Sequence, residues 1–286
     1  MSLEVPPVSR KKGFLPNLVV IGGMKCGTSS LHSYLRRHPQ ISMSAEKELD
    51  FFIEDRQWRR GAEWYASQFR DTRVRGEASP NYTARDRFPG VPERMHSVIP
   101  DARLIYLVRD PIERVISHWV HLYSEDGEIP PIDEAIRNII YVGRSQYWRQ
   151  LCAFLEYYPA DRILVVDSDD LRHRRSEAMQ RIFRFIGVDP EFSSPLYRLE
   201  RHRSSFLRKK TPLGERLAST GLEGRLDRLP RPWGWGAKRL MFLPFSRAIP
   251  RPRLSDPARE WLADQFRDDV AQLRAFTGLS LKGWSV

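Results

Sequence analysis

A chain of 286 residues is long enough to bury a sizeable core, as one large α/β domain or two small ones. Its 47 Lys and Arg against 36 Asp and Glu give a net charge of +11, which favours an anionic ligand, nucleic acid or an anionic membrane surface as partner without choosing among them. Two cysteines, Cys26 and Cys152, exclude a disulfide framework and match no metal-ligand spacing. No apolar run reaches the length of a membrane span and no apolar leader follows the first basic residues, so we expect a soluble, cytoplasmic protein.

The predicted elements alternate between strands and helices. Residues 1–16, with three prolines and a short basic run, are predicted to be a disordered tail, and 17–286 a single domain. Hydrophobic patterns predict strands over 18–21, 41–44, 73–78, 103–108 and 163–166, and helices over 63–69, 111–122, 148–155, 179–186 and 257–278; a further helix is predicted to begin at 28–30 and to continue through 31–38. This alternation predicts a three-layer α/β fold, in which a mainly parallel central sheet is flanked by helices and binds ligands beyond the carboxyl ends of its strands.

The stretch 18–31 runs from an apolar strand through a glycine-rich turn into a helix. Gly22 and Gly27 have the spacing of the ATP-binding P-loop, but Thr28 stands where that motif has lysine, and the only lysine of the turn is Lys25. Free N–H groups at the helix start, together with Lys25 and the neighbouring hydroxyls, suit an anion. The nucleotide therefore need not be a triphosphate with magnesium. The alternative is a strand-to-helix turn without a ligand.

A second anion site is predicted at the end of the strand 103–108. Arg109 follows this strand, and Ser117 lies eight residues on, about two turns into the next helix. A guanidinium fixed at a strand end offers forked donors to a phosphate, and a nearby hydroxyl adds one more. The alternative is a salt bridge from Arg109 to Asp110 or Glu113, with Ser117 as an ordinary helix residue.

These motifs resemble the sulfotransferases that use 3′-phosphoadenosine 5′-phosphosulfate (PAPS). GGMKCGTSSL is similar to the 5′-phosphosulfate loop of that family, and YLVRDPIERVISHW to its 3′-phosphate segment. KELDFF, GEASPNY, FLEYYPADRILVV and the terminal helix followed by 278–284 resemble the Golgi-type and bacterial carbohydrate-sulfotransferase branch. The resemblance implies a P-loop-like fold and sulfuryl transfer.

The resemblance also implies which residues bind PAPS. Arg109 and Ser117 would hold the 3′-phosphate, and Lys25 would lie near the bridging oxygen, where charge appears during transfer. A sulfuryl group carries less charge than a phosphoryl group, so no metal is expected. The residues implied for the 5′-phosphosulfate are Lys25, Cys26, Gly27, Thr28, Ser29 and Ser30. For Cys26, a small packing residue is the main interpretation and an acidified thiol the alternative.

An acceptor loses a proton as it attacks, so a base is required beside it. The resemblance implies Glu48 of KELDFF as this base; without it, Glu48 would be read as an exposed member of a mixed-charge run. His118 and His121 are rival bases. Candidate acceptor-side residues are Lys47, Asp50, Glu77 and His121. The family often has His or Asn at Asp50, and Glu77 is expected to orient Lys25, to face the acceptor or to form a structural ion pair.

Residues 201–253 are basic and aromatic with weak periodicity, and we expect a loop and helical region near the donor or acceptor site. Arg208 and Lys209 are candidates for the donor within a basic run of Arg201, Arg203, Arg208, Lys209 and Lys210; the alternative is a solvated basic face. A wall or lid over a glycan or lipid acceptor is suggested by Trp233, Trp235, Phe242 and Phe245, with core packing as the alternative.

The sequence thus predicts in-line sulfuryl transfer from PAPS to a hydroxyl, or as second choice an amine, of a carbohydrate, glycolipid or small natural product. A peripheral contact with a membrane or lipid acceptor is a further expectation, and nucleic acid is not expected as a partner. One alternative is a P-loop kinase of small molecules, although the lysine after Gly27 is absent. The other is a basic nucleic-acid-binding protein, which leaves the paired phosphate motifs unexplained.

Overall fold

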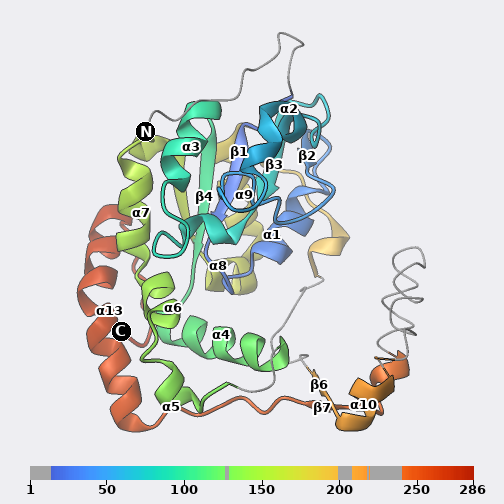
Figure 1. Ribbon diagram of the computed structural model, residues 1–286. Helices are drawn as coiled ribbons and strands as arrows, with labels where there is room; N and C mark the ends of the chain where they lie inside the picture. Colours follow the sequence, from blue (N-terminus) through green and yellow to red (C-terminus); the bar gives the residue numbers. More distant parts are fainter. Residues whose placement is uncertain (1–13, 126–128, 199–207, 218, 220–239) are drawn as a thin grey trace.

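The computed structural model describes residues 14–125, 129–198, 208–217, 219 and 240–286 (Figure 1). Within them, five parallel strands form one sheet in the order β2-β3-β1-β4-β5. The strands are β1 (Leu18–Gly22), β2 (Ile41–Met43), β3 (Val74–Ala78), β4 (Arg103–Val108) and β5 (Ile163–Asp167). Val19 at the centre of the sheet pairs with Glu77 on one side and Leu104 on the other. The predicted α/β fold with a parallel central sheet is confirmed.

Burial explains why these strands could be recognised. All five residues of β1 are buried, and in β4 only Arg103 is not. Strands of a parallel sheet that is covered by helices on both faces are apolar throughout rather than alternating. The five predicted strands therefore agree with the observed ones to within one residue at each end.

Helices flank the sheet, and α7 and α13 lie side by side along one flank (Figure 1). The α-helices are α1 (Thr28–Leu35), α2 (Gly61–Ala66), α3 (Val91–Val98), α4 (Pro111–Glu125), α5 (Ile132–Ala135), α6 (Ile139–Val142), α7 (Tyr147–Leu155), α8 (Ser168–His173), α9 (Arg175–Ile186), α10 (Pro212–Leu217) and α13 (Asp256–Thr277). Short 3₁₀ turns are η1 (Trp58–Arg60), η2 (Pro80–Thr83), η3 (Gly143–Ser145), η4 (Ala160–Arg162) and η5 (Pro195–Arg198). None of the described helices is long and apolar enough to span a bilayer.

The helices agree with the prediction less closely than the strands do: α9 begins four residues earlier than predicted, and α5, α6 and α8 were not predicted. α1 begins at Thr28, within the predicted start, where Gly27 adopts φ 94° as its N-cap, but it ends at Leu35, before the predicted end at His38. The segment of α3 gave no helical signal, since Pro92 and two charged residues open it. One of these charges, Arg94, is buried and donates to the backbone oxygens of Phe52 (2.8 Å) and Pro89 (2.7 Å).

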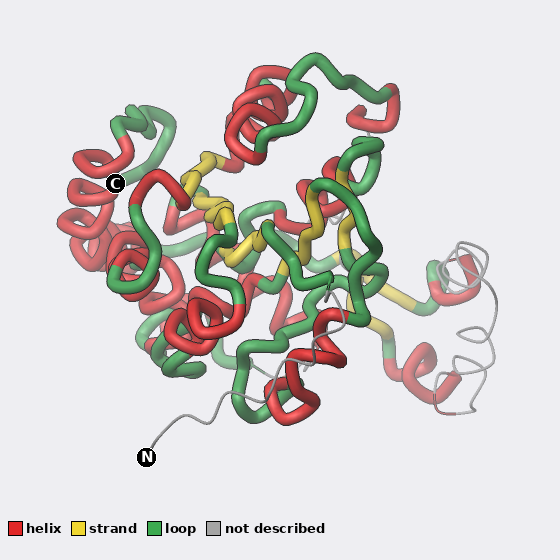
Figure 2. The backbone as a smooth tube through the Cα atoms, turned by 90° about the horizontal axis from the view of Figure 1, so that it is seen from above, coloured by secondary structure: helices red, strands yellow, loops and turns green. Residues whose placement is uncertain are grey.

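The later region contains a small arm that the sequence did not predict. β6 (Arg208–Lys210) and β7 (Ser246–Ala248) form an antiparallel pair. Figures 1 and 2 show this pair and α10 projecting away from the sheet, beyond the end of α4. Most of the predicted tail, and Arg201, Arg203, Trp233 and Trp235, lie outside the described residues.

Candidate active site

The glycine-rich turn lies at the carboxyl end of β1, where its backbone shape depends on two glycines. A Cβ on Gly22 would come within 2.2 Å of Thr83 Oγ1, so only glycine fits against this buried threonine. Gly27 combines φ 94° with open space around its Cα, and the N–H groups of Thr28 and Ser29 open α1, where no earlier turn of the helix supplies them with a carbonyl partner. The turn is therefore shaped to present backbone donors to an anion.

Lys25 supplies the cation of this turn. Its φ is 68°, and its ammonium group makes no hydrogen bond or ion pair with any described residue. Burial lowers the pKa of Lys25, while the charges of Glu125 and Glu48 act in the opposite direction. Lys25 is thus available to a ligand and lies within the electrostatic reach of Glu48.

Arg109 brings the second predicted anion site to the same place. Its Nη1 lies 3.5 Å from the Lys25 backbone oxygen, and its Nη2 lies 3.3 Å from Glu113 Oε2. The structure thus contains the salt bridge to Glu113 that was the alternative to a phosphate site, and it also brings the two phosphate motifs into contact. Ser117 is buried on α4, and its hydroxyl forms no hydrogen bond with the described residues. Glu113 is also bound by Arg251 (2.5 Å), a late-chain residue that sequence reasoning missed.

Cys26 belongs to the packing beneath the turn. Its side chain is 1 % exposed, and its Sγ lies 3.6 Å from the Tyr147 hydroxyl. Burial raises the pKa of the thiol, which is the opposite of an acidified cysteine. Only the backbone of Cys26 therefore remains as a contact for a ligand.

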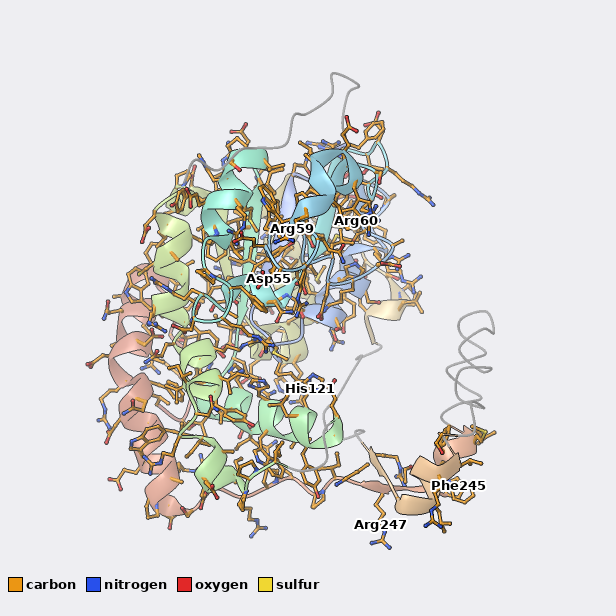
Figure 3. The ribbon with its side chains drawn as sticks, in the orientation of Figure 1. Asp55, Arg59, Arg60, His121, Phe245 and Arg247 are labelled. Atoms are coloured by element: carbon orange, nitrogen blue, oxygen red, sulfur yellow. The ribbon has the colours of Figure 1, made fainter. Side chains whose placement is uncertain are left out.

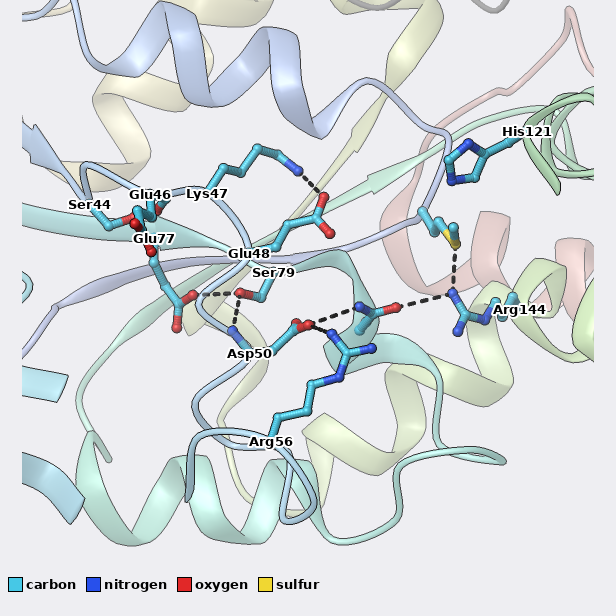
Figure 4. Close-up of polar contacts among 12 residues, drawn as sticks. Ser44, Glu46, Lys47, Glu48, Asp50, Arg56, Glu77, Ser79, His121 and Arg144 are labelled. Carbon is cyan, nitrogen blue, oxygen red and sulfur yellow. Dashed lines mark hydrogen bonds and ion pairs between the residues drawn. The ribbon is translucent and has the colours of Figure 1, made fainter. Parts of the chain in front are cut away.

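Glu48 lies on the loop that follows β2 (Figure 4). Its backbone N–H donates to Ala78 O at the end of β3 (3.1 Å), and it adopts φ 65°. Its carboxylate is 44 % exposed and bound by Lys47 Nζ at 2.5 Å. The carboxylate is thus held near the strand ends while remaining open to an acceptor.

Glu77 has a different environment from any that we expected. It is fully buried and accepts hydrogen bonds from Tyr65 (2.5 Å), Ser79 (2.6 Å) and Tyr82 (2.8 Å). Among the described residues its carboxylate forms neither the expected contact with Lys25 nor an ion pair. Burial raises the pKa of Glu77, and the three hydroxyl donors oppose that rise.

The Ser79 hydroxyl connects Glu77 to the acceptor-side loop. It accepts a hydrogen bond from the backbone N–H of Asp50 (3.0 Å) while donating to Glu77. Asp50 has φ 49°, so this bond helps to hold an uncommon backbone conformation two residues after Glu48. Glu77 therefore holds the loop that carries Glu48 and Asp50 through the Ser79 hydroxyl. Its own carboxylate is buried and does not face the acceptor.

The Asp50 side chain begins a polar network between the acceptor-side loop and the donor turn (Figure 4). Its Oδ2 accepts from Arg56 and from Asn81 Nδ2 (3.1 Å). Asn81 Oδ1 accepts from Arg144 Nη1 (3.3 Å), which also contacts Met24 Sδ (2.7 Å). The second carboxylate oxygen of Asp50, Oδ1, is buried and has no partner among the described residues. Sequence reasoning missed this network because its members are far apart in the chain.

The two rival bases lie on α4 but differ in access. His118 is 1 % exposed and contacts Arg114 (3.4 Å); burial, with Arg114 and Arg144 nearby, lowers its pKa and keeps it neutral. His121 is more accessible and points toward the region between Glu48 and Arg144, with its Nε2 3.5 Å from Glu125 Oε1 (Figures 3 and 4). His121 is therefore the better placed of the two histidines.

Arg208 and Lys209 lie apart from Arg109. Arg208 is bonded within the arm, to Ser246 Oγ (2.9 Å) and Ser246 O (2.5 Å), and Lys209 lies over the Tyr123 ring (4.7 Å). Tyr123 is twelve residues along α4 from Pro111, which corresponds to about 18 Å. Figure 3 likewise shows Phe245 and Arg247 on the arm, well separated from His121. The structure therefore places Arg208 and Lys209 near the far end of α4 from Arg109, and their assignment to the donor stays a prediction.

The family model for the sulfotransferase domain matches residues 15–214. The chain belongs to the sulfotransferase family. This match favours sulfuryl transfer over the kinase and nucleic-acid-binding alternatives. Its described residues contain no group of three or more metal-ligating side chains.

Individual relatives refine this result. The chain is 35% identical over 143 residues to the membrane-associated sulfotransferase kil1 of Dictyostelium discoideum, covering 47% of this chain and 29% of that protein. It is 26% identical to human heparan sulfate glucosamine 3-O-sulfotransferase 5, covering 63% and 55% of the two chains. A sulfotransferase from Alicyclobacillus acidocaldarius has the same fold, with a TM-score of 0.66 at 21% identity, covering 98% of this chain and 100% of that one. The chain thus spans less than two thirds of the length of both curated relatives.

The match to a membrane-associated protein contradicts the predicted soluble, cytoplasmic location. That prediction depended on the lack of a long apolar run. A protein can associate with a membrane through amphipathic or basic surfaces. The lack of a spanning helix therefore does not assign a cellular location.

Proposed function

We propose that this sulfotransferase uses PAPS as donor and transfers its sulfuryl group to a hydroxyl or amine of a carbohydrate-containing acceptor. The observation that carries the proposal is the meeting of Lys25 and Arg109 at the carboxyl ends of the adjacent strands β1 and β4. Glu48 is held beyond β3, on the other side of β1. The residues for an anionic donor and the base for the acceptor thus lie near one another, at the carboxyl ends of neighbouring strands.

The donor set fits a nucleotide bisphosphate with an attached sulfuryl group. The 5′-phosphosulfate is assigned to Lys25 and to the backbone and hydroxyls of the turn that follows, Cys26, Gly27, Thr28, Ser29 and Ser30. Arg109 and Ser117 are assigned to the 3′-phosphate. The uncommitted ammonium of Lys25 and the N–H groups at the start of α1 support the first assignment.

PAPS supplies an activated sulfuryl group, and the protein residues handle the charge and the proton. The acceptor oxygen or nitrogen forms a bond to sulfur as the bond from sulfur to the bridging oxygen breaks, and that electron pair stays on the departing bisphosphate. Lys25 stabilises the new charge at the bridging oxygen. The acceptor proton passes to the Glu48 carboxylate, whose exposure leaves it open to the acceptor.

The carbohydrate part of the proposal draws on the relatives, several of which are named as heparan sulfate sulfotransferases. A sulfotransferase fold alone does not define an acceptor. The acceptor side of this chain includes Lys47 and Asp50 beside Glu48, and His121 across from it.

Donor binding is tested by the melting temperature with adenosine 3′,5′-bisphosphate, compared with ATP plus magnesium and with ADP. A ligand at one hundred times its dissociation constant stabilises the fold by about 2.7 kcal/mol. We expect a shift with the bisphosphate that Lys25→Ala and Arg109→Ala both abolish. Arg267→Ala, on the outer face of α13, is the matched control and keeps the shift. A shift with magnesium ATP alone would contradict the donor assignment.

The base is tested separately, with radiolabelled PAPS and a glycan panel. We expect Glu48→Gln to bind the bisphosphate like wild type and to lose at least about 100-fold in turnover, a typical contribution of a general base. Turnover at the wild-type rate would assign the proton to another group, and His121→Asn is then the variant that should lose it.

A further inference from the structure

We propose that the acceptor is acidic, and that Arg144, Arg87 and Arg56 bind a carboxylate or sulfate group adjacent to the atom that receives the sulfuryl group. The inference rests on the proposed function, because it requires the acceptor to lie beside Glu48. It goes further by naming a charge that the acceptor carries. None of the three arginines was a sequence candidate.

Arg144 is the anchor of this site. Its side chain is largely buried, with 9 % of the residue exposed, yet its two partners, Met24 and Asn81, are both neutral. Its Nε and Nη2 atoms donate to no described residue. Neither atom is among the fully buried polar atoms that lack a partner, so both remain open to a ligand. A buried guanidinium is costly unless an anion compensates it. The pKa of Arg144 is accordingly lowered to about 10, first by burial and then by Arg114, Arg87 and Arg56.

Arg56 and Arg87 extend the positive region around Phe88. Their guanidinium carbons lie 5.2 Å and 5.3 Å from the centre of the Phe88 ring. Contact with a ring leaves the forked N–H donors free to bind a carboxylate or sulfate. Asp50 compensates Arg56, whereas Arg87 is exposed and has no ion pair among the described residues. The uncompensated charges are therefore those of Arg87 and Arg144.

Topology assigns this positive region to the acceptor instead of the donor. The donor residues follow β1 and β4, while Arg56 and Arg87 follow β2 and β3, on the opposite side of β1. Arg144 lies between the two sides: its Nη1 is bonded to Asn81, which leads to Asp50, and also contacts Met24 Sδ of the donor turn. Figure 4 shows Glu48, Asp50, Arg56 and Arg144 around one region.

The Asp50 carboxylate limits where an acidic group can bind. Its Oδ2 is occupied by Arg56 and Asn81, and its buried Oδ1 has no partner. An anion is repelled there, whereas a hydroxyl of the acceptor can donate to Oδ1. The acceptor that suits the whole site therefore carries a hydroxyl toward Asp50 and an anionic group toward Arg144 and Arg87. Sugar acids and sulfated sugars have this chemistry.

The test compares acidic glycans with their neutral counterparts. The probes are heparosan, chondroitin and polymannuronate oligosaccharides, each also used after reduction of its carboxylates to alcohols. Binding to the bisphosphate-loaded protein is measured by calorimetry, and sulfuryl transfer with radiolabelled PAPS. We expect at least one acidic glycan to bind on the order of 10-fold or more tightly than its reduced form, the range of charge-assisted hydrogen bonds.

Variants then locate the effect. Arg87→Met, at an exposed position, and Arg144→Met should each reduce this preference severalfold and leave the melting shift with the bisphosphate intact; Arg144→Lys should keep part of it. Arg267→Met removes one positive charge far from the site and should change nothing. Equal affinity for acidic and reduced glycans, including no measurable binding of either, would overturn the inference, while a normal bisphosphate shift would leave the donor assignment standing. Loss of bisphosphate binding in both arginine variants would also overturn it, by assigning these cations to the donor.

Discussion

Glu77→Gln tests the idea that a buried carboxylate beneath the sheet edge positions the catalytic loop. The substitution leaves an oxygen for the two tyrosine hydroxyls but can place an NH₂ group where Ser79 Oγ now donates at 2.6 Å. One charge-assisted hydrogen bond is lost and two become neutral, a gross loss of about 2–4 kcal/mol. Part of this loss is recovered because the substitution also removes a buried charge, and burial of that charge is what raises the pKa of Glu77. The net loss in the free energy of unfolding should be about 1–3 kcal/mol.

Activity should respond through the hydroxyl of Ser79. When the hydrogen bond from Ser79 to Glu77 is lost, the Ser79 hydroxyl can rotate and accepts less well from the Asp50 N–H. The loop that carries Glu48 then becomes more mobile. We expect about a tenfold loss in kcat, since misplacement of a catalytic group by a fraction of an ångström is costly. The bisphosphate melting shift should be unchanged.

The assay combines urea unfolding with initial rates of sulfuryl transfer. Tyr65→Phe is the matched control: it removes one donor to the same carboxylate without touching Ser79, so stability falls while kcat is kept. Ser79→Ala should show the reverse, with a larger effect on kcat than on stability. The reasoning would be refuted if Glu77→Gln and Ser79→Ala both retained the wild-type kcat.

Two further predictions concern the strand ends. Burial raises the pKa of Asp167 from 3.8 to about 6. Between these pH values the folded protein therefore binds more protons than the unfolded chain. The free energy of unfolding should consequently fall by up to about 3 kcal/mol as the pH rises through this range. Asp167→Asn, which keeps an N-cap for α8, should flatten this dependence in urea unfolding at about pH 4.5 and 7.5; an unchanged slope would contradict it. Gly22→Ala should cost about 1–3 kcal/mol by its 2.2 Å clash with Thr83 Oγ1, and Thr83→Ala in the same chain should recover part of the loss. If the double variant were no more stable than Gly22→Ala, the clash would not be the cause.

The sheet and the donor turn could be predicted because their signals are local. β1 and β4 are short apolar runs, and the residues that would meet an anion follow each run directly in the chain. Adjacency of the two parallel strands then brings Lys25 and Arg109 together without further information. The same two segments were the specific part of the resemblance to sulfotransferases, which later segments such as KELDFF and GEASPNY supported.

The acceptor side could not be predicted in this way because its contacts join distant segments. Arg144 contacts Met24 across 120 positions and Asn81 across 63, and no spacing in the sequence marks such pairs. Glu77 was recognised as an acid of interest, but nothing in the sequence showed that Tyr65, twelve residues earlier and outside any motif, and Tyr82 of GEASPNY both donate to its carboxylate. Whether an acid faces a ligand or is buried beneath one depends on such packing.

Backbone conformation adds a second reason. Four described residues other than glycine have positive φ, and three of them are Lys25, Glu48 and Asp50. Such conformations are unfavourable for side chains with a Cβ, and they persist where surrounding contacts hold them, as the bonds to Ala78 O and Ser79 Oγ do for the latter two. They redirect the side chains away from where a regular strand or helix would send them. The residues proposed for leaving-group stabilisation and proton removal thus depend on local strain, and so a variant that relaxes the loop, such as Ser79→Ala, should change turnover more than binding.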